Sequence, residues 1–254
     1  MKDTLRQVLV ALAVIATLIV NALANSLPLG GVTTAQVSDQ FQVYFVPAGY
    51  VFSIWGLIYI GLIVYAVFQA LPSQRENPRL RKIGYPFIIG SLANIIWLFM
   101  WHYQQFPLTL VFMLILLAML IVAYLNLGTG RTQVSKAETW AVRVPFSVYL
   151  GWITVATIAN VTDLLYYWKW DGFGISGQTW ALILFAAALV IAGLMSLTRR
   201  DIGYNLVIVW ALAGIAVKQS AVQSLVIGAL VTTGLVLAVL VYSLIRKRPA
   251  GKKA

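Results

Sequence analysis

Cysteine is absent from this 254-residue chain, and histidine occurs once. Disulfides, thiolate metal sites and cysteine nucleophiles are therefore excluded. Charge is also scarce, because only 10% of the residues are charged and just seven are acidic, whereas soluble domains carry about 25% charged residues. Hydrophobic residues make up 61% of the chain, and the mean hydropathy is +0.88. These values predict an all-α protein, a polytopic bundle of transmembrane helices.

Eight apolar stretches approach the length of about 20 residues that a helix needs to cross the hydrocarbon core of a bilayer. They cover residues 5–24, 48–71, 84–103, 107–127, 140–165, 178–197, 204–218 and 222–245. The seventh stretch is short, so its boundaries are the least well defined. We therefore expect about eight transmembrane helices.

The basic residues give this bundle an orientation. Sixteen of the 18 lysines and arginines lie at the amino terminus, in the loops after the second, fourth and sixth spans or at their margins, or in the carboxyl-terminal tail. Lys169 and Lys218 lie on the other side. The positive-inside rule then predicts cytoplasmic termini and a multi-pass protein of the cell (inner) membrane. The same placement accounts for the net charge of +11, so we expect no nucleic-acid partner.

The first span also has features of a signal peptide. Lys2 and Arg6 precede an apolar run that ends in Ala22-Leu23-Ala24, which resembles a cleavage site. The apolar run is long for a signal peptide, and we expect this span to be retained.

Aromatic and amide side chains recur at three- and four-residue steps on spans two, three and five, so that each set shares one helix face. The residues are Phe52, Trp55, Tyr59, Asn94, Trp97, Trp101, Tyr149, Trp152 and Asn160. These faces could simply pack the bundle. An amide in mid-span is costly unless it faces protein or a cavity, and buried Trp and Tyr need hydrogen-bond partners. We favour an intramembrane cavity.

The motifs on these spans resemble the TspO/MBR family, the tryptophan-rich sensory proteins that include the translocator protein, or peripheral benzodiazepine receptor. They read FVPAGYVFSIWGLIY at 45–59, SLANIIWLFMW at 91–101 and VPFSVYLGWITVATIAN at 144–160. Tyr50 stands where the family has a tryptophan, and Phe146 stands where it has a tyrosine. The resemblance implies a TspO-like five-helix core over residues 1–170. Residues 171–254 would add three helices and a basic tail, as in a longer branch of the family.

The resemblance further implies a sensor or regulator that binds a hydrophobic planar ligand, porphyrin- or haem-like or sterol-like, inside the five-helix core. The nine residues above would line that pocket. The loop after the first span would form a lid that includes Pro28, Tyr44, Pro47 and Tyr50. Membrane lipid is the expected surrounding, and a homodimer is possible because family members commonly dimerise. No cofactor is firmly implied beyond porphyrin or haem as ligand.

Catalytic and metal-binding patterns are absent from the sequence. His102 stands alone near a span end, so we expect an interfacial residue rather than a haem ligand. Asp163 lies near the outer end of span five and Asp201 in a loop, and we do not expect a buried proton relay from either. We expect no enzyme, although the resemblance leaves light-dependent porphyrin breakdown open. The alternative functions are a small-molecule transporter and a structural partner of a membrane complex.

Overall fold

A computed structural model describes residues 2–26 and 29–246, and its regular elements in those ranges are all helical. The helices are α1 (Lys2–Ser26), α2 (Thr34–Ser38), α3 (Ile54–Ala70), α4 (Pro78–His102), α5 (Phe106–Leu127), α6 (Lys136–Glu138), α7 (Val144–Tyr167), α8 (Gly177–Arg199), α9 (Ile202–Lys218) and α10 (Gln223–Ile245). A 3-10 turn, Gly49–Ser53, leads into α3, and a π-helical turn, Thr139–Arg143, joins α6 to α7. The prediction of an all-α helical bundle is confirmed.

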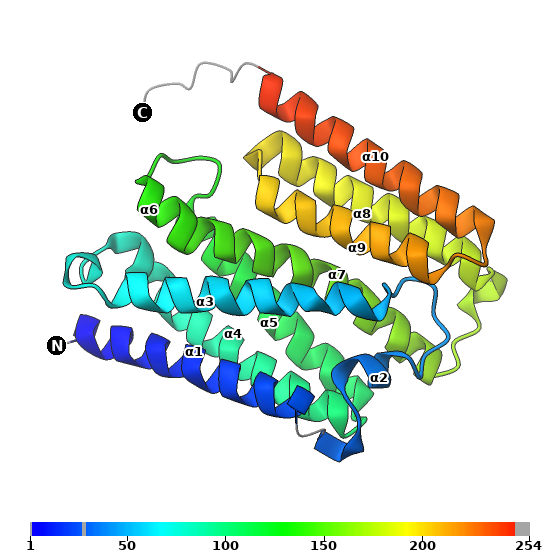
Figure 1. The fold of residues 1–254 in the computed structure, drawn as a ribbon, viewed down its shortest axis with the longest axis horizontal. Coiled ribbons are helices and arrows are strands. Elements are labelled where there is room, and N and C mark those ends of the chain that lie inside the picture. Colours follow the sequence, from blue (N-terminus) through cyan, green and yellow to red (C-terminus); the bar gives the residue numbers. More distant parts are fainter. Residues whose placement is uncertain (1, 27–28, 247–254) are drawn as a thin grey trace.

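Seven of the described helical segments are long and apolar enough to cross a membrane. The eighth expected span corresponds to α9, which has 17 residues and is about 26 Å long at 1.5 Å per residue. It lies beside α8 and α10 in Figure 1 and packs against both. The short seventh span of the prediction is therefore a helix of the bundle, although it is shorter than its neighbours.

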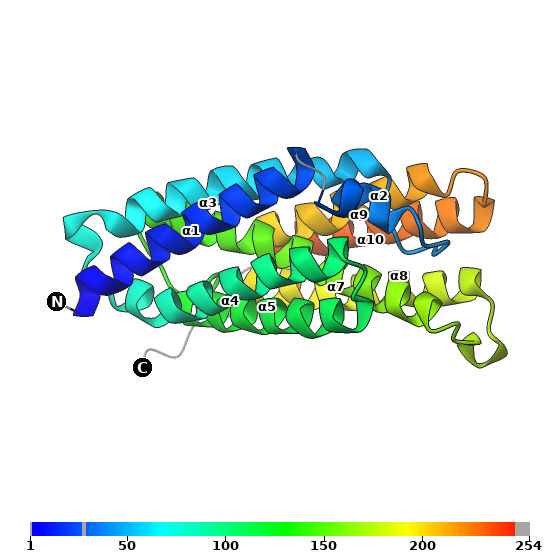
Figure 2. The same cartoon turned by 90° about the horizontal axis from the view of Figure 1, so that it is seen from below.

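Five helices form a closed ring. Helix α1 packs against α3 and α4, α5 packs against α4 and α7, and α3 packs against α7. Figure 2 shows α1 and α3 on one side of this ring and α4 and α5 on the other. The remaining helices lie outside the ring, where α9 packs on α7 and α10 packs on α8 and α9.

The helix ends carry the local signals that such ends require. Asn77 accepts a hydrogen bond from the backbone N–H of Arg79, and Pro78 fills the first turn of α4. Gly128 ends α5 in a left-handed conformation with φ of 62°. Asp201 caps α9 by accepting the backbone N–H of Tyr204 at 3.0 Å.

The start of α1, the α3–α4 turn and α6 lie at one end of the bundle (Figure 1), and basic residues concentrate there. Arg6 donates to the backbone carbonyls of Leu80 and Arg75 at 3.2 and 2.9 Å. Arg79 pairs with Glu138 at 2.8 Å. The prediction of cytoplasmic termini rests on these basic residues. Which side of the membrane this end faces stays a prediction.

Candidate ligand-binding cavity

A cavity lies inside the five-helix ring, towards the end that α2 covers. Its volume is about 40 Å³, enough for a few water molecules. The walls come from α3, α4, α5 and α7 and from the segment between α1 and α3. The lining residues are Thr34, Ser38, Val46, Pro47, Phe52, Trp55, Trp97, Trp101, Met113, Trp152, Val155, Ala156, Ala159, Asn160 and Asp163.

Helix α7 forms one wall because its cavity residues follow each other by three or four positions. Trp152, Ala156 and Asn160 are spaced by four residues, and Asp163 follows three residues later, so all four share a face. The small side chain of Ala156 leaves space between the indole of Trp152 and the polar groups of Asn160 and Asp163. The wall is therefore aromatic at one end and polar at the other.

Aromatic rings build the opposite walls. Trp152 meets Phe52 and Trp55 edge to face, with ring centroids 5.6 and 6.3 Å apart. On α4, Trp97 and Trp101 are stacked, with centroids 5.6 Å apart and an interplanar angle of 19°. Such pairs present flat apolar faces together with indole N–H groups that need partners.

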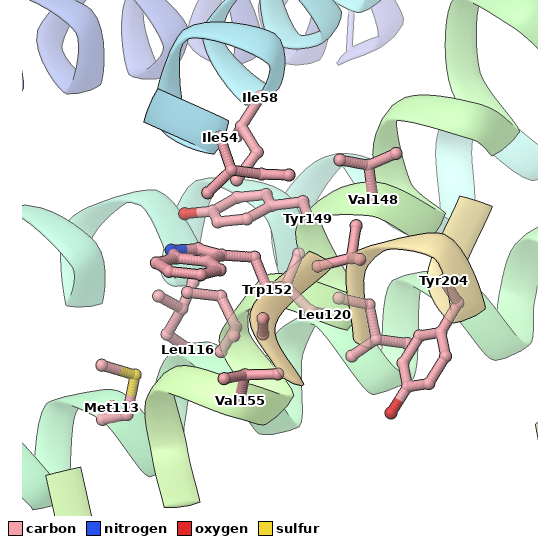
Figure 3. Close-up of a cluster of buried hydrophobic side chains, with 14 of the residues drawn as sticks. Ile54, Ile58, Met113, Leu116, Leu120, Val148, Tyr149, Trp152, Val155 and Tyr204 are labelled. Carbon is pink, nitrogen blue, oxygen red and sulfur yellow. The ribbon is translucent and has the colours of Figure 1, made fainter. Parts of the chain in front are cut away.

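Several polar atoms at the cavity are buried without a hydrogen-bond partner among the described residues. On lining residues these are the indole nitrogens of Trp97 and Trp152, Oδ1 of Asn160 and Oδ1 of Asp163. The hydroxyl of Tyr149 is also buried without a partner. Figure 3 shows the hydroxyl oxygen of Tyr149 and the indole nitrogen of Trp152 pointing to the same side. Because buried polar groups are nearly always paired with protein, water or ligand, these atoms make the cavity the candidate site for a ligand.

The orientation of the Asn160 amide follows from its neighbours. The Thr109 hydroxyl donates to the Phe106 carbonyl at 2.7 Å, so its oxygen is left to accept. Asn160 Nδ2 supplies that hydrogen bond at 3.0 Å. Since the amide nitrogen is fixed by Thr109, the amide oxygen of Asn160 is an acceptor that remains available.

Residues 29–53, between α1 and α3, cover this end of the ring and are called the lid below. Helix α4 holds the first half of the lid in place. The indole of Trp101 donates to the Thr34 carbonyl at 3.1 Å. The His102 ring bonds the Leu29 carbonyl through Nδ1 and the Thr34 hydroxyl through Nε2, both at 3.1 Å. His102 is the last residue of α4, at the expected span end, and it is only 2% exposed because the lid covers it. Its role in the fold is to fasten this lid to α4.

Helix α9 holds the second half of the lid. The backbone N–H of Ala48 donates to the Gly214 carbonyl at 3.1 Å, and the Trp210 indole donates to the Val51 carbonyl at the same distance. A Cβ added at Gly214 would lie 2.1 Å from a methyl carbon of Val51, so only glycine permits this approach. Lys218 adds an ion pair with Asp39 at 2.7 Å. The lid therefore bridges the ring and the outer helices.

Most of the residues predicted for the pocket converge on this cavity, and three do not line it. The lining residues among them are Phe52, Trp55, Trp97, Trp101, Trp152 and Asn160, together with Pro47 of the lid. Tyr59 stacks on Trp55 one turn away, and Tyr149 contacts Trp55 from α7, so both lie behind the wall. Asn94 instead accepts a hydrogen bond from Asn21 of α1 at 2.9 Å and ties two helices of the ring together.

The other lid residues of the prediction have different surroundings. Tyr50 packs against Trp210 of α9, with ring centroids 5.5 Å apart, and the Tyr44 carbonyl accepts from Gln219 at 3.2 Å. Neither lines the cavity. Pro28 lies outside the described residues.

Two aspartates are more buried than the sequence indicated. Asp163 is 2% exposed and Asp201 is 6% exposed. Asp201 accepts hydrogen bonds from Tyr124, Ser147 and Tyr204, whereas Asp163 contributes to the cavity wall. A signal for Asp163 was present in the sequence, because it continues the helix face of Trp152 and Asn160 by three residues.

A family model described as TSPO-like protein matches residues 7–243. The match extends beyond the segment 1–170, on which the resemblance rests, and includes the outer helices. No curated protein and no solved structure matches the chain significantly. Because the family model covers well over half of the chain, the protein belongs to the TSPO-like protein family and is a multi-pass helical membrane protein of the TspO type.

Proposed function

We propose that this TspO-type protein is a membrane sensor or regulator that binds a hydrophobic, planar ligand, porphyrin- or haem-like or sterol-like, in the cavity of the five-helix ring. The observation that carries the proposal is the set of unpartnered polar atoms on aromatic walls, at Trp97, Trp152, Asn160 and Asp163. A flat ligand can stack on the rings, and its polar groups can pair with those atoms.

Binding of such a ligand requires the cavity to expand. A volume of about 40 Å³ is far below the roughly 300–1,000 Å³ of typical small-molecule sites. We infer that the lid is the element that moves, because it covers the cavity and is not part of a long helix, although hydrogen bonds, one ion pair and the rings around Phe41 hold it. Lid opening would then couple ligand occupancy to the position of α9, which is the kind of change that a sensor transmits.

Tryptophan fluorescence of the protein in lipid nanodiscs tests this proposal. Protoporphyrin IX, haemin and cholesterol are titrated separately, and protoporphyrin IX or haemin should quench the emission in a saturable way. In Trp152→Phe the affinity for the ligand that binds should fall about three- to tenfold, because part of the aromatic contact and the indole donor are lost. The control is Trp168→Phe, since Trp168 is exposed and outside the cavity.

Equal affinity of the wild-type protein and Trp152→Phe for every ligand would overturn binding in this cavity. Transport and a structural role in a membrane complex stay as alternatives, and homodimer formation stays a prediction.

A further inference from the structure

Among the described residues, the polar end of the cavity contains one carboxyl group and no basic side chain. Its polar side chains are Thr34, Ser38, Asn160 and Asp163, and the lining contains no lysine, arginine or histidine. The described ion pairs do not include Asp163. Lys218 is close enough to act on Asp163 electrostatically, but its ammonium pairs with Asp39 at 2.7 Å. The carboxyl group therefore faces the cavity without a cation of its own.

Two residues that line this end carry an oxygen without a partner in the described part of the chain. Asp163 Oδ1 and Asn160 Oδ1 are both buried and unpartnered, and they lie one turn apart on the same face of α7. The amide of Asn160 is held in this orientation because one N–H of Nδ2 donates to the Thr109 hydroxyl, whose own proton goes to the Phe106 carbonyl. A ligand group that satisfies both atoms must donate at least two hydrogen bonds.

We propose that, among hydrophobic planar ligands, this site prefers one that carries a protonated amine, held by Asp163 and Asn160 at the polar end while the apolar body lies among the tryptophans. An ammonium has three donors, and its charge would stabilise the ionised form of a carboxyl group that burial otherwise disfavours. A hydroxyl has one donor and no charge. A carboxylate has no donor for either oxygen. This inference rests on the proposed function and specifies the ligand chemistry of the same site.

The aromatic walls agree with this chemistry. Trp97, Trp101 and Trp152 line the same cavity as Asp163, and indole faces attract ammonium groups through the ring quadrupole. A cation at this end therefore gains from the carboxyl group and from the surrounding rings. The acidic side chains of a porphyrin would have to point away from Asp163, towards the lid.

Three ligands with the same apolar body test the proposal: 2-naphthylmethylamine, 2-naphthalenemethanol and 2-naphthoate. Each is titrated calorimetrically into the protein in nanodiscs of zwitterionic lipid, with empty nanodiscs subtracted. The amine should bind at least about tenfold more tightly than the alcohol, because it gains a charge-assisted hydrogen bond. The carboxylate should bind most weakly. The net charge of +11 would by itself favour the opposite order, so non-specific attraction cannot produce this ranking.

Asp163→Asn should weaken binding of the amine about tenfold and change binding of the alcohol less than about twofold. The matched control is Asp171→Asn, because Asp171 is exposed and caps the Gly172–Gly174 turn outside the cavity. If Asp163→Asn does not fold, the order of affinities of the three ligands for the wild-type protein still tests whether the site prefers an amine.

The outcomes separate this inference from the proposed function. Equal binding of amine and alcohol, with both weakened by Trp152→Phe, would overturn the amine and leave the cavity as a ligand site. Binding of protoporphyrin IX without binding of any naphthyl ligand would also overturn the amine. Absence of saturable binding by every ligand, naphthyl, porphyrin and sterol, would overturn the proposed function and the inference together.

Discussion

Asp163 and Asp201 are two buried carboxyl groups with opposite surroundings. Asp201 accepts hydrogen bonds from the hydroxyls of Tyr124 and Ser147 at 2.7 and 2.6 Å and from the backbone N–H of Tyr204 at 3.0 Å. Asp163 is at least as buried, yet its Oδ1 has no partner in the part of the chain that the structure describes. The two carboxyl groups therefore differ in their supply of donors rather than in burial, and this difference makes Asp163 the candidate binding group.

The two carboxyl groups lie towards opposite ends of the bundle, Asp163 near the end of α7 and Asp201 at the start of α9. At the end of Asp201, charged side chains from different helices are tied to each other or to backbone carbonyls: Arg143 donates to the Leu127 carbonyl at 2.8 Å and Arg79 pairs with Glu138. At the other end, the polar atoms of the cavity wall stay unpartnered, and a lid covers them. Within the described ranges, buried atoms without a partner also occur near Asp201, at Nε of Arg143 and Oγ1 of Thr129, so the difference lies in the immediate surroundings of the two carboxyl groups.

Replacing each aspartate by alanine should give the largest difference between the two sites. Asp201→Ala leaves two hydroxyls and a helix N-terminus without an acceptor, and the free energy of unfolding should fall by about 3 kcal/mol or more. Asp163→Ala removes a buried group that lacks a protein partner, so stability should be unchanged or higher by about 1 kcal/mol. Thermal and denaturant unfolding in detergent, monitored by circular dichroism, measures both. A similar loss of stability in the two variants would contradict the comparison.

Gly214→Ala tests whether the lid is the movable part of the cavity end. The added methyl group would collide with Val51, and relieving the clash should cost about 1–3 kcal/mol, mostly by releasing the lid from α9. Hydrogen–deuterium exchange should then rise about tenfold or more for amides 48–54, which include the Ala48 N–H bonded to Gly214.

The control for this change is Gly193→Ala, because a Cβ at Gly193 meets nothing within 4 Å. It should leave exchange in the lid unchanged. Unchanged exchange in Gly214→Ala as well would show that the lid does not depend on α9.

The sequence allowed the helices and most of the cavity wall to be predicted because both follow from local periodicity. Spacing places Trp152 and Asn160 on one helix face and Trp97 and Trp101 on another, and the family resemblance implies that these faces meet in a pocket. Such a pattern does not tell which neighbouring helix each face meets.

Asn94 shows where periodicity fails. Its partner is Asn21, 73 residues away in sequence, and only the packing of α1 against α4 brings the two amides together. Asp163 was assigned to the outer interface because it lies near the end of its span, but the lid buries that end. The attachment of the lid to α9 was likewise beyond prediction, since it depends on the close approach at Gly214. The predicted division of the chain at residue 170 stays a prediction. The hydrogen bonds between the lid and α9 join residues on the two sides of that position.

The smallest expected effect concerns Lys218, which pairs with Asp39 and acts electrostatically on Asp163. Lys218→Gln should lower stability by less than about 1 kcal/mol, because the pair is partly exposed. It should also strengthen binding of 2-naphthylmethylamine about twofold, since one positive charge near the cavity is removed. The gain should shrink in high salt and disappear in the Asp163→Asn background. Lys169→Gln is the matched control, because Lys169 does not act on Asp163. Weaker amine binding in Lys218→Gln would mean that Lys218 supports the site by holding the lid rather than by repelling the cation. Asp163 would then depend on a neighbouring charged residue, and its surroundings would differ less from those of Asp201.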